Sequence, residues 1–326
     1  MNKLLYVYED RIPEKLRELV RTAIPREEFQ ITELTYSAPE TEWVEKLKAN
    51  DVVLFAPGRF VPDHVLEHAK HIKLMQLWSS GYDKFNLAGC TRLGIPVANN
   101  GGANACSVAE HAVMLMLATS RKLPDCHERT VTGHWAGNSN GLDMFLMAEK
   151  TVGIIGFGNI GRFVAKKLSG FDMHVKYFDP KRATPEVEKE LRAEYVSMED
   201  LLATSDIITL HLHNTKETQN IIGQSEFALM KEGSLLINVS RAQLVDQEAL
   251  VAALTSGRLR AAGVDVYMQE PTTGDEPLLK LPNVVATPHT AGSTFDTYSM
   301  VMRRAVQNFR TVARGEEAQW LINKEE

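Results

Sequence analysis

Short apolar segments alternate with helix-type segments along residues 1–102. Four segments rich in apolar and β-branched residues are expected to form strands, at residues 4–8, 52–56, 74–78 and 97–99. Three segments between them are expected to form helices, at 13–24, 39–49 and 62–70, and each begins with a proline, which is tolerated at the first helical position. Because strands alternate with helices, this part predicts an α/β unit with a parallel sheet.

The same alternation resumes at residue 151 and continues through six further strand segments. They lie at residues 151–155, 174–179, 207–212, 234–239, 262–267 and 283–287. Before them, 103–122 predicts a long helix that is nearly apolar all round and therefore buried. Residues 124–147 have no clear period and are expected to form an irregular arm, whereas 295–313 predict an amphipathic helix that returns to the first unit. The whole pattern predicts an α/β protein of two domains, one of them doubly wound.

Composition agrees with two soluble domains and excludes several other classes. A chain of 326 residues with 44% hydrophobic content is sufficient for about two cores. The net charge of -6 and the scattered Lys and Arg argue against a nucleic-acid partner. The three cysteines, Cys90, Cys106 and Cys126, suit a reducing compartment, and the longest strongly apolar run, residues 112–118, is too short to span a membrane. The start reaches acidic residues too early for a signal peptide, so we expect a cytoplasmic protein.

A glycine pattern follows the strand at 151–155. Gly156, Gly158 and Gly161 have the spacing G-x-G-x-x-G and lead into a predicted helix at 160–168. In a dinucleotide site the first glycine allows a tight turn, the second lets the backbone approach a pyrophosphate, and the third lets helix and strand pack closely. The spacing also occurs in ordinary strand–helix turns. Asp179 ends the next strand, 18 residues after Gly161, where a carboxylate can bind the ribose hydroxyls of NAD.

Three polar residues lie just beyond the carboxyl ends of three successive predicted strands. They are Arg241, Glu270 and His289. Open α/β sheets bind their ligands at these ends. Arginine offers a planar fork for the carboxylate of a 2-keto acid, histidine can give or take a proton near neutral pH, and glutamate can orient that histidine. Each residue alone is typical of a surface or loop position, but the three beside a dinucleotide motif predict an active site.

Three histidines on the predicted helix at 62–70 and just beyond it resemble a metal site by spacing alone. His64, His68 and His71 fall on one helical face. Nothing nearby in the sequence offers a clear fourth ligand. We therefore expect a solvated face and no metal.

Six motifs together resemble the D-isomer-specific 2-hydroxyacid dehydrogenase family over essentially the whole chain. They are Ser80-Gly-Tyr-Asp83, Asn104-Ala-Cys-Ser-Val-Ala-Glu-His111, Gly156-Phe-Gly-Asn-Ile-Gly161, Asn238-Val-Ser-Arg-Ala-Gln-Leu-Val-Asp246, Gly263-Val-Asp-Val-Tyr-Met-Gln-Glu-Pro271 and Thr287-Pro-His-Thr-Ala-Gly292. The resemblance implies a Rossmann domain at residues 103–292, inserted into a smaller flavodoxin-like α/β substrate domain made of residues 1–102 and 293–326. It also implies a homodimer formed through residues 103–149.

The resemblance further implies a role for each matching residue. Arg241 would bind the substrate, His289 would be the acid/base with Glu270 as its partner, and Ser80 and Gly81 would offer backbone donors to the substrate carboxylate. The implied contacts to NAD are Gly156, Gly158, Asn159, Ile160, Gly161, Asp179, Leu212, Val239, Ser240, Arg241, Asp265, His289 and Gly292. Within this set, Asn159 and Ile160 would lie against the pyrophosphate and Asp265 against the nicotinamide carboxamide.

The sequence departs from the family pattern at three positions without losing a catalytic group. Ala242 stands where glycine usually follows the arginine, and Glu149 stands where glycine usually precedes Lys150. Asn214 lies where the family often has proline-rich sequence.

The expected function is NAD(H)-dependent interconversion of a small 2-keto acid, such as glyoxylate or hydroxypyruvate, and its D-2-hydroxy acid. Glu270 separates the chain from formate dehydrogenases, which carry glutamine there, and Ser80 from phosphite oxidisers, which carry lysine. One alternative is a phosphoglycerate-type dehydrogenase, although the residues after Gly315 leave no room for the regulatory domain of the longer ones. The other is an NADH-sensing binding protein like the C-terminal binding corepressors, against which the lack of long basic tails argues.

Overall fold

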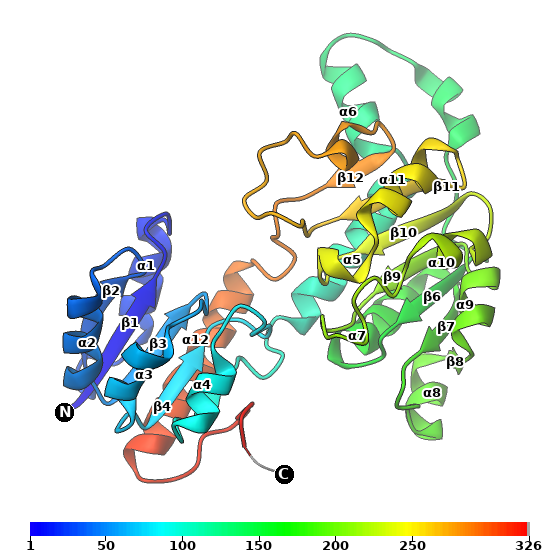
Figure 1. Ribbon diagram of the computed structural model, residues 1–326. Helices are drawn as coiled ribbons and strands as arrows, with labels where there is room; N and C mark the ends of the chain where they lie inside the picture. The colour runs from blue at the N-terminus through cyan, green and yellow to red at the C-terminus, as the bar shows by residue number, and fades with distance from the viewer. Residues whose placement is uncertain (325–326) are drawn as a thin grey trace. The chain divides into compact units, whose positions relative to one another are not determined.

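The computed structural model describes residues 1–324 and divides them into two compact units (Figure 1). The first unit combines Met1–Asn104 with the segment that begins at Ser293, and the second unit is Ala105–Gly292. Each unit is built around one sheet whose neighbouring strands are all parallel. In the part of the chain that the structure describes, no helix is long and apolar enough to cross a membrane.

The first unit has a five-stranded sheet in the order β2-β1-β3-β4-β5. Its strands are β1 (Asn2–Tyr8), β2 (Phe29–Thr35), β3 (Val52–Ala56), β4 (Leu74–Leu77) and β5 (Val97–Ala98). Strand β2 was not expected, because it lies at the sheet edge and mixes polar with apolar positions, so it has no continuous apolar run. The other four strands coincide with the predicted segments to within one residue at each end, except that β1 begins two residues earlier.

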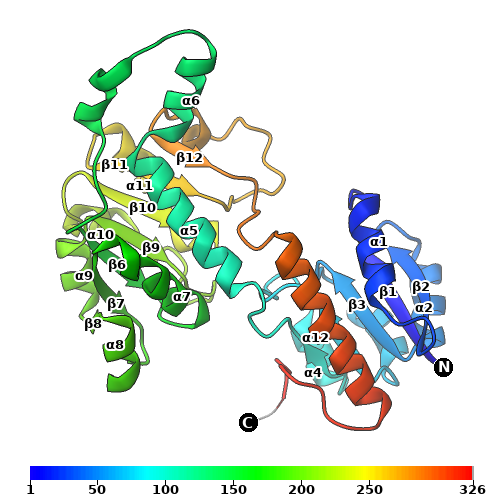
Figure 2. The ribbon, with the colours of Figure 1, turned by 180° about the vertical axis from the view of Figure 1, so that it is seen from behind.

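Helices cover both faces of this sheet. They are α1 (Glu14–Ala23), α2 (Glu40–Ala49), α3 (Asp63–Leu66), α4 (Leu87–Arg92) and α12 (Phe295–Ala313), with a 3₁₀ helix η1 (Glu67–Ala69) after α3. Three helices were expected to begin at a proline, but each begins one residue after it, so the prolines are the N-cap residues of α1, α2 and α3. Helix α12 crosses the sheet (Figure 2) and buries Met302 and Phe309 against Tyr6, Leu54 and Leu74.

The second unit has a seven-stranded sheet in the order β12-β11-β10-β9-β6-β7-β8. Its strands are β6 (Thr151–Ile155), β7 (His174–Phe178), β8 (Ala193–Tyr195), β9 (Ile207–Leu210), β10 (Ser234–Asn238), β11 (Leu259–Val264) and β12 (Val284–Ala286). Only β8 was not expected, because three residues are too few to show a pattern. From β6 the chain adds strands first toward β8 and then, from β9, toward β12. Doubly wound sheets bind ligands at such a reversal, beyond the carboxyl ends of the strands.

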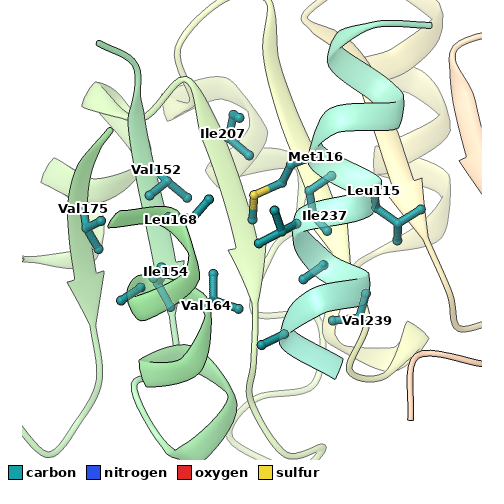
Figure 3. Close-up of a cluster of buried hydrophobic side chains, with 14 of the residues drawn as sticks. Leu115, Met116, Val152, Ile154, Val164, Leu168, Val175, Ile207, Ile237 and Val239 are labelled. Carbon is teal, nitrogen blue, oxygen red and sulfur yellow. The ribbon is translucent and has the colours of Figure 1, made fainter. Parts of the chain in front are cut away.

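Most helices of the second unit bury apolar side chains in its core. The helices of this unit are α5 (Ala105–Ser120), α6 (Leu123–Val131), α7 (Asn159–Leu168), α8 (Pro185–Leu191), α9 (Met198–Thr204), α10 (Gln224–Leu229) and α11 (Gln247–Thr255). Figure 3 shows Leu115 and Met116 of α5, Val164 of α7, and Ile154 and Ile237 of the sheet as members of one buried apolar cluster. Helix α5 is buried along most of its length, as its apolar sequence predicted.

The expectation of an irregular arm at residues 124–147 was wrong in its first part. Helix α6 and a 3₁₀ helix η2 (Gly137–Asp143) occupy much of this segment. Proline at the start of α6 is compatible with a helix, but α6 buries no residue. A helix with no buried face needs no apolar period, and periodicity is the signal from which it would have been predicted.

Candidate active site

The glycine turn between β6 and α7 requires glycine at its first and third positions. Gly156 has a φ of +94°, and a Cβ there would lie 2.6 Å from the carbonyl oxygen of His211. A Cβ on Gly161 would lie 2.2 Å from the carbonyl oxygen of Gly156. The backbone therefore turns sharply and the helix approaches the turn more closely than any other residue would allow.

The middle glycine has a different environment. A Cβ built on Gly158 would meet no atom within 4 Å, so the structure itself does not require glycine there. Asn159 and Ile160 begin helix α7 directly after it, and the N–H groups of a helix N-terminus favour an anion. Open space over a glycine at such a terminus fits the pyrophosphate of a dinucleotide.

Asp179 lies one residue beyond β7 and beside this turn. One carboxylate oxygen accepts the N–H of Phe157 at 2.8 Å, and the other accepts the N–H of Lys181 at 2.8 Å. The carboxylate is thus held next to the glycine turn, and each oxygen keeps a second lone pair. This position suits contact with a hydroxyl pair on a ligand lying over the turn.

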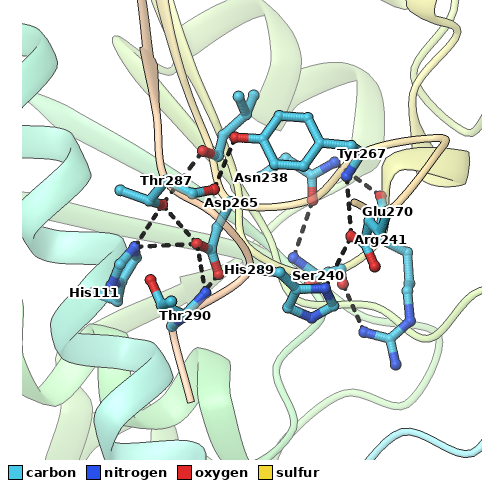
Figure 4. A network of polar contacts seen from close by, with 12 residues as sticks. His111, Asn238, Ser240, Arg241, Asp265, Tyr267, Glu270, Thr287, His289 and Thr290 are labelled. Carbon is cyan, nitrogen blue, oxygen red and sulfur yellow. Dashed lines mark hydrogen bonds and ion pairs between the residues drawn. The ribbon is translucent and has the colours of Figure 1, made fainter. Parts of the chain in front are cut away.

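His289 and Glu270 form a direct pair at the carboxyl ends of β11 and β12 (Figure 4). Nδ1 of His289 lies 2.8 Å from Oε1 of Glu270, and that oxygen also accepts the N–H of Tyr267 at 3.2 Å. An ionised carboxylate can only accept, so Nδ1 carries a proton and Nε2 is left for chemistry. The His289 side chain is 44% exposed and that of Glu270 is 18% exposed, so the imidazole is accessible while its partner is shielded.

The backbone of His289 has an uncommon conformation. Its φ is +53°, in the left-handed region that non-glycine residues rarely adopt. Such strain persists only where the surroundings hold it, and it is common at functional sites.

Asp265 supplies much of that hold, because it anchors the loop that carries His289. It is fully buried at the end of β11, accepts the N–H groups of Thr290 and Ala291 at 2.9 and 2.8 Å, and accepts the Thr287 hydroxyl at 2.6 Å. The hydroxyl of Tyr267 donates to the carbonyl oxygen of Thr287 at 2.7 Å, and burial raises the pKa of Tyr267 to about 12, so the phenol stays a donor.

His111 of α5 extends this network from the helix side. Its Nε2 lies 2.9 Å from the Thr287 hydroxyl and 3.5 Å from Asp265 (Figure 4). Burial lowers the pKa of His111, and the nearby Asp265 carboxylate opposes this effect in part. No role was expected for His111 from the sequence, since the contact depends on where α5 crosses the sheet.

Arg241 lies in the loop that follows β10, and hydrogen bonds tie this loop to its surroundings. The side-chain amide of Asn238 donates to the carbonyl oxygen of Arg241 at 2.8 Å, and the hydroxyl of Ser240 donates to that of Leu210 at 2.6 Å. Nη1 of Arg241 donates to the carbonyl oxygen of Ser240 at 2.7 Å. Because β10, β11 and β12 are neighbouring parallel strands, Arg241, Glu270 and His289 lie at one edge of the sheet.

Comparison with known proteins places this site in a family. The model for the D-isomer specific 2-hydroxyacid dehydrogenase NAD binding domain matches residues 113–291, more than half of the chain. The chain belongs to the D-isomer-specific 2-hydroxyacid dehydrogenases. The resemblance expected from the sequence is thereby confirmed, and the chain is an oxidoreductase of this family.

Two relatives and one solved structure show how far this membership extends. The dehydrogenase is 37% identical to the glyoxylate reductase of Thermococcus litoralis over 292 residues, and this aligned region covers 88% of each chain. It is 35% identical to the D-3-phosphoglycerate dehydrogenase of Archaeoglobus fulgidus over 84% of this chain and 51% of that relative. The apo-structure of D-lactate dehydrogenase from Escherichia coli matches with a TM-score of 0.82 at 27% identity, over 98% of this chain and 99% of that one. These matches confirm the two-domain α/β fold.

Two residues implied as substrate donors lie in the other unit of the dehydrogenase. Ser80 and Gly81 follow β4 in the first unit, where the carbonyl oxygen of Ser80 accepts the Asn99 side chain at 2.9 Å and that of Gly81 accepts the Ser79 hydroxyl at 2.7 Å. Arg241 and His289 lie in the second unit. The part of Ser80 and Gly81 in substrate binding therefore stays a prediction, as do the roles of Arg241 and His289 and all the implied contacts to NAD.

The three spaced histidines have separate surroundings. His64 lies 3.0 Å from a Glu40 oxygen, and His71 lies 3.1 Å from the carbonyl oxygen of Asn50. Among residues 1–324, no group of three or more His, Cys, Asp or Glu side chains could hold a metal ion.

Proposed function

We propose that this dehydrogenase reduces a small 2-keto acid of the glyoxylate or hydroxypyruvate kind to its D-2-hydroxy acid with NADH, and catalyses the reverse oxidation with NAD. The observation that carries the proposal is the 2.8 Å contact between Nδ1 of His289 and Oε1 of Glu270. It leaves Nε2 of a partly exposed imidazole as a proton donor and acceptor at the sheet edge where such folds bind ligands.

His289 acts as the acid in reduction and as the base in oxidation. When bound, NADH supplies the hydride that reduces the keto carbon. His289 then donates its Nε2 proton to the carbonyl oxygen, and in the reverse direction Nε2 takes the proton from the hydroxyl. Glu270 keeps the imidazole in the required tautomer and orientation. Asp265 and Tyr267 act through the backbone, because they hold the loop on which the imidazole is carried.

Arg241 binds the carboxylate of the substrate and polarises the keto carbonyl next to it. A guanidinium matches a carboxylate with two parallel hydrogen bonds, which orients the keto carbon as well as binding the anion. The hydrogen bonds from Asn238 and Ser240 keep the loop of Arg241 in place.

The second unit binds the cofactor and NAD is preferred over NADP. The turn at Gly156, Gly158 and Gly161 takes the pyrophosphate, and the carboxylate of Asp179 takes the ribose hydroxyls. A 2′-phosphate placed beside that carboxylate would be repelled. The first unit, including Ser80 and Gly81, contributes to substrate binding.

The relatives support a small keto acid but leave two candidates for it. Several archaeal relatives named glyoxylate reductase are 34–37% identical to this chain. The relatives named D-3-phosphoglycerate dehydrogenase, at 34–35% identity, make a phosphorylated keto acid the second candidate.

A homodimer is part of the proposal. The segment from α6 to the start of β6 exposes several large apolar side chains, which an isolated chain would leave in water. They are Leu123, Val131, Trp135, Leu142 and Leu146. A second copy of the same segment is the partner that would cover them.

The test is NADH oxidation by the purified protein with glyoxylate, hydroxypyruvate, pyruvate and 3-phosphohydroxypyruvate, each repeated with NADPH. The proposal expects the highest kcat/KM with one of the first two substrates and with NADH. Highest activity with the phosphorylated acid would favour the second candidate. Binding of NADH without turnover of any keto acid would instead favour an NADH-sensing binding protein.

A further inference from the structure

Arg182 lies three residues after Asp179, on the loop between β7 and α8, and its guanidinium is already occupied. Nε donates to Oε1 of Glu188 at 2.8 Å and Nη2 donates to Oε2 at 3.0 Å. The guanidinium also stacks on Tyr195, with its carbon 5.2 Å from the ring centroid. Arg182 therefore uses its bidentate hydrogen-bonding edge within the protein.

Glu188 is the fixed member of this pair. The hydroxyl of Tyr177, a fully buried residue, donates to Oε1 of Glu188 at 2.6 Å and accepts the N–H of Ala183 at 3.0 Å. The side chain of Glu188 is 15% exposed and that of Arg182 is 61% exposed. Hydrogen bonds from Arg182 and Tyr177 lower the pKa of Glu188 to about 2, so it stays ionised in the working range of pH. Glu188 thus holds Arg182, and not the reverse.

The position of this pair matters for cofactor choice. Asp179 and Arg182 share one short loop, and Asp179 is the residue proposed to face the adenosine ribose. A 2′-phosphate on that ribose needs a nearby cation to offset the Asp179 carboxylate, and arginine is the side chain best suited to bind phosphate. Of the two basic residues that follow Asp179, Lys181 and Arg182, the arginine is the one engaged by Glu188.

We infer that Glu188 is a cofactor-specificity residue, which keeps Arg182 from the 2′-phosphate of NADP and so reinforces the preference that Asp179 begins. The inference rests on the proposed binding of the ribose at Asp179. It makes Glu188 a positioning residue, since it acts through Arg182 and has no contact of its own with the cofactor. Replacement of Glu188 frees the Arg182 guanidinium to bind the 2′-phosphate. Replacement of Arg182 alone removes no contact to NADPH, because Glu188 already engages that guanidinium in the wild type.

The experiment compares kcat/KM for NADPH and NADH in wild type, Glu188→Gln, Arg182→Ala, the double variant, and Glu186→Gln. Glu186 lies on the same helix, is exposed and hydrogen-bonds with Thr184, so it matches the charge change without releasing Arg182. Glu188→Gln should raise kcat/KM for NADPH roughly 5- to 30-fold, mainly through KM, which is the gain expected from one charge-assisted phosphate contact. NADH should change much less, and Glu186→Gln should show no comparable gain for NADPH.

Three outcomes would overturn the inference. An unchanged kcat/KM for NADPH in Glu188→Gln, or a gain that persists in the double variant, would show that Arg182 is not the released group. Arg182→Ala, at an exposed position, remains informative if Glu188→Gln folds poorly. Arg182→Ala should keep kcat/KM for NADPH within about 2-fold of wild type, because in the wild type Glu188 already keeps Arg182 from contacting the phosphate. A larger loss would show that Arg182 binds the phosphate in the wild type.

Binding measurements separate this inference from the proposed function. Titration calorimetry with ADP-ribose and its 2′-phosphate needs no turnover, so the same variants can be compared even if no keto acid is reduced. Tighter binding of the 2′-phosphate by Glu188→Gln, lost again in the double variant, supports the inference in that case. Equal binding by all variants counts against it whatever the substrate proves to be.

Discussion

Nδ1 of His289 and the backbone N–H of Tyr267 both contact Oε1 of Glu270, at 2.8 and 3.2 Å. The carboxylate is therefore fixed by its own loop while it orients the imidazole on the next one. An arrangement of this kind determines which nitrogen of His289 carries the proton before any substrate binds.

Glu270→Gln should lower kcat for keto-acid reduction by roughly 10- to 1,000-fold. General acid–base catalysis contributes roughly 100- to 10,000-fold, and the uncharged amide should orient His289 less well and so lose part of that contribution. KM for the keto acid should change little, because we propose that Arg241, and not Glu270, binds the substrate carboxylate. Steady-state kinetics in both directions provide the measurement. A kcat equal to that of wild type would show that the pair has no part in proton transfer.

Arg241→Ala should lower kcat/KM by roughly 30- to several-thousand-fold, since the loss of a bidentate charged contact costs about 2–5 kcal/mol. Arg241→Lys keeps the charge and loses the planar fork, so its loss should be intermediate. The dissociation constant for NADH, measured by fluorescence titration, should change much less in both variants. Near-normal turnover by Arg241→Ala would place the substrate carboxylate elsewhere.

Gly158→Ala and Gly161→Ala should separate cofactor binding from folding. A Cβ at residue 158 meets nothing within 4 Å, whereas one at residue 161 comes within 2.2 Å of a carbonyl oxygen. Gly158→Ala should therefore keep the Tm of the ligand-free protein and weaken NADH binding, because its Cβ would fill the space proposed for the pyrophosphate. Gly161→Ala should lower the Tm as well. The prediction fails if Gly158→Ala binds NADH as tightly as wild type.

His211 should make the second unit sensitive to acid. Its Nε2 lies 3.0 Å from the Thr209 hydroxyl, its buried Nδ1 has no hydrogen-bond partner among the described residues, and burial lowers its pKa to about 3. The unfolded state takes up a proton near pH 6.5 and the folded state resists it. Stability is therefore fully present above about pH 6.5 and falls by roughly 1.4 kcal/mol per unit as the pH drops below it.

His211→Gln cannot be protonated, so the difference in Tm between pH 7.5 and pH 5.5 should shrink by about 2–4 °C relative to wild type. His174→Gln is the matched control, because His174 is an exposed histidine of the same unit. Calorimetry at the two pH values gives the comparison. Equal acid sensitivity in wild type and His211→Gln would mean that another group controls it.

Much of the fold could be predicted because the buried strands of both sheets are short continuous apolar runs. The edge strands β2 and β8 and the exposed helix α6 could not, since each lacks the buried face that produces a periodic signal. Glu149 was noted as a departure from the family, and its φ of +63° now gives the reason for glycine there.

The candidate site was predictable in its principal residues for a topological reason. Arg241, Glu270 and His289 follow neighbouring parallel strands, and sequence order alone places such residues at one sheet edge. The supporting contacts were not predictable. The approach of His111 to Thr287, and of Glu188 to Arg182, depends on how a helix lies against the sheet and which way a side chain turns.

In the proposed reaction, hydride reaches the keto carbon while His289 supplies the proton. The most direct measurement of this reaction is the product formed from hydroxypyruvate and NADH that is dideuterated at C4 of the nicotinamide, analysed by mass spectrometry and chiral chromatography. The expected product is D-glycerate with one deuterium at C2, and His289→Ala should form almost none while still binding NADH. Product with protium at C2, product of the L configuration, or undiminished formation by His289→Ala would contradict it.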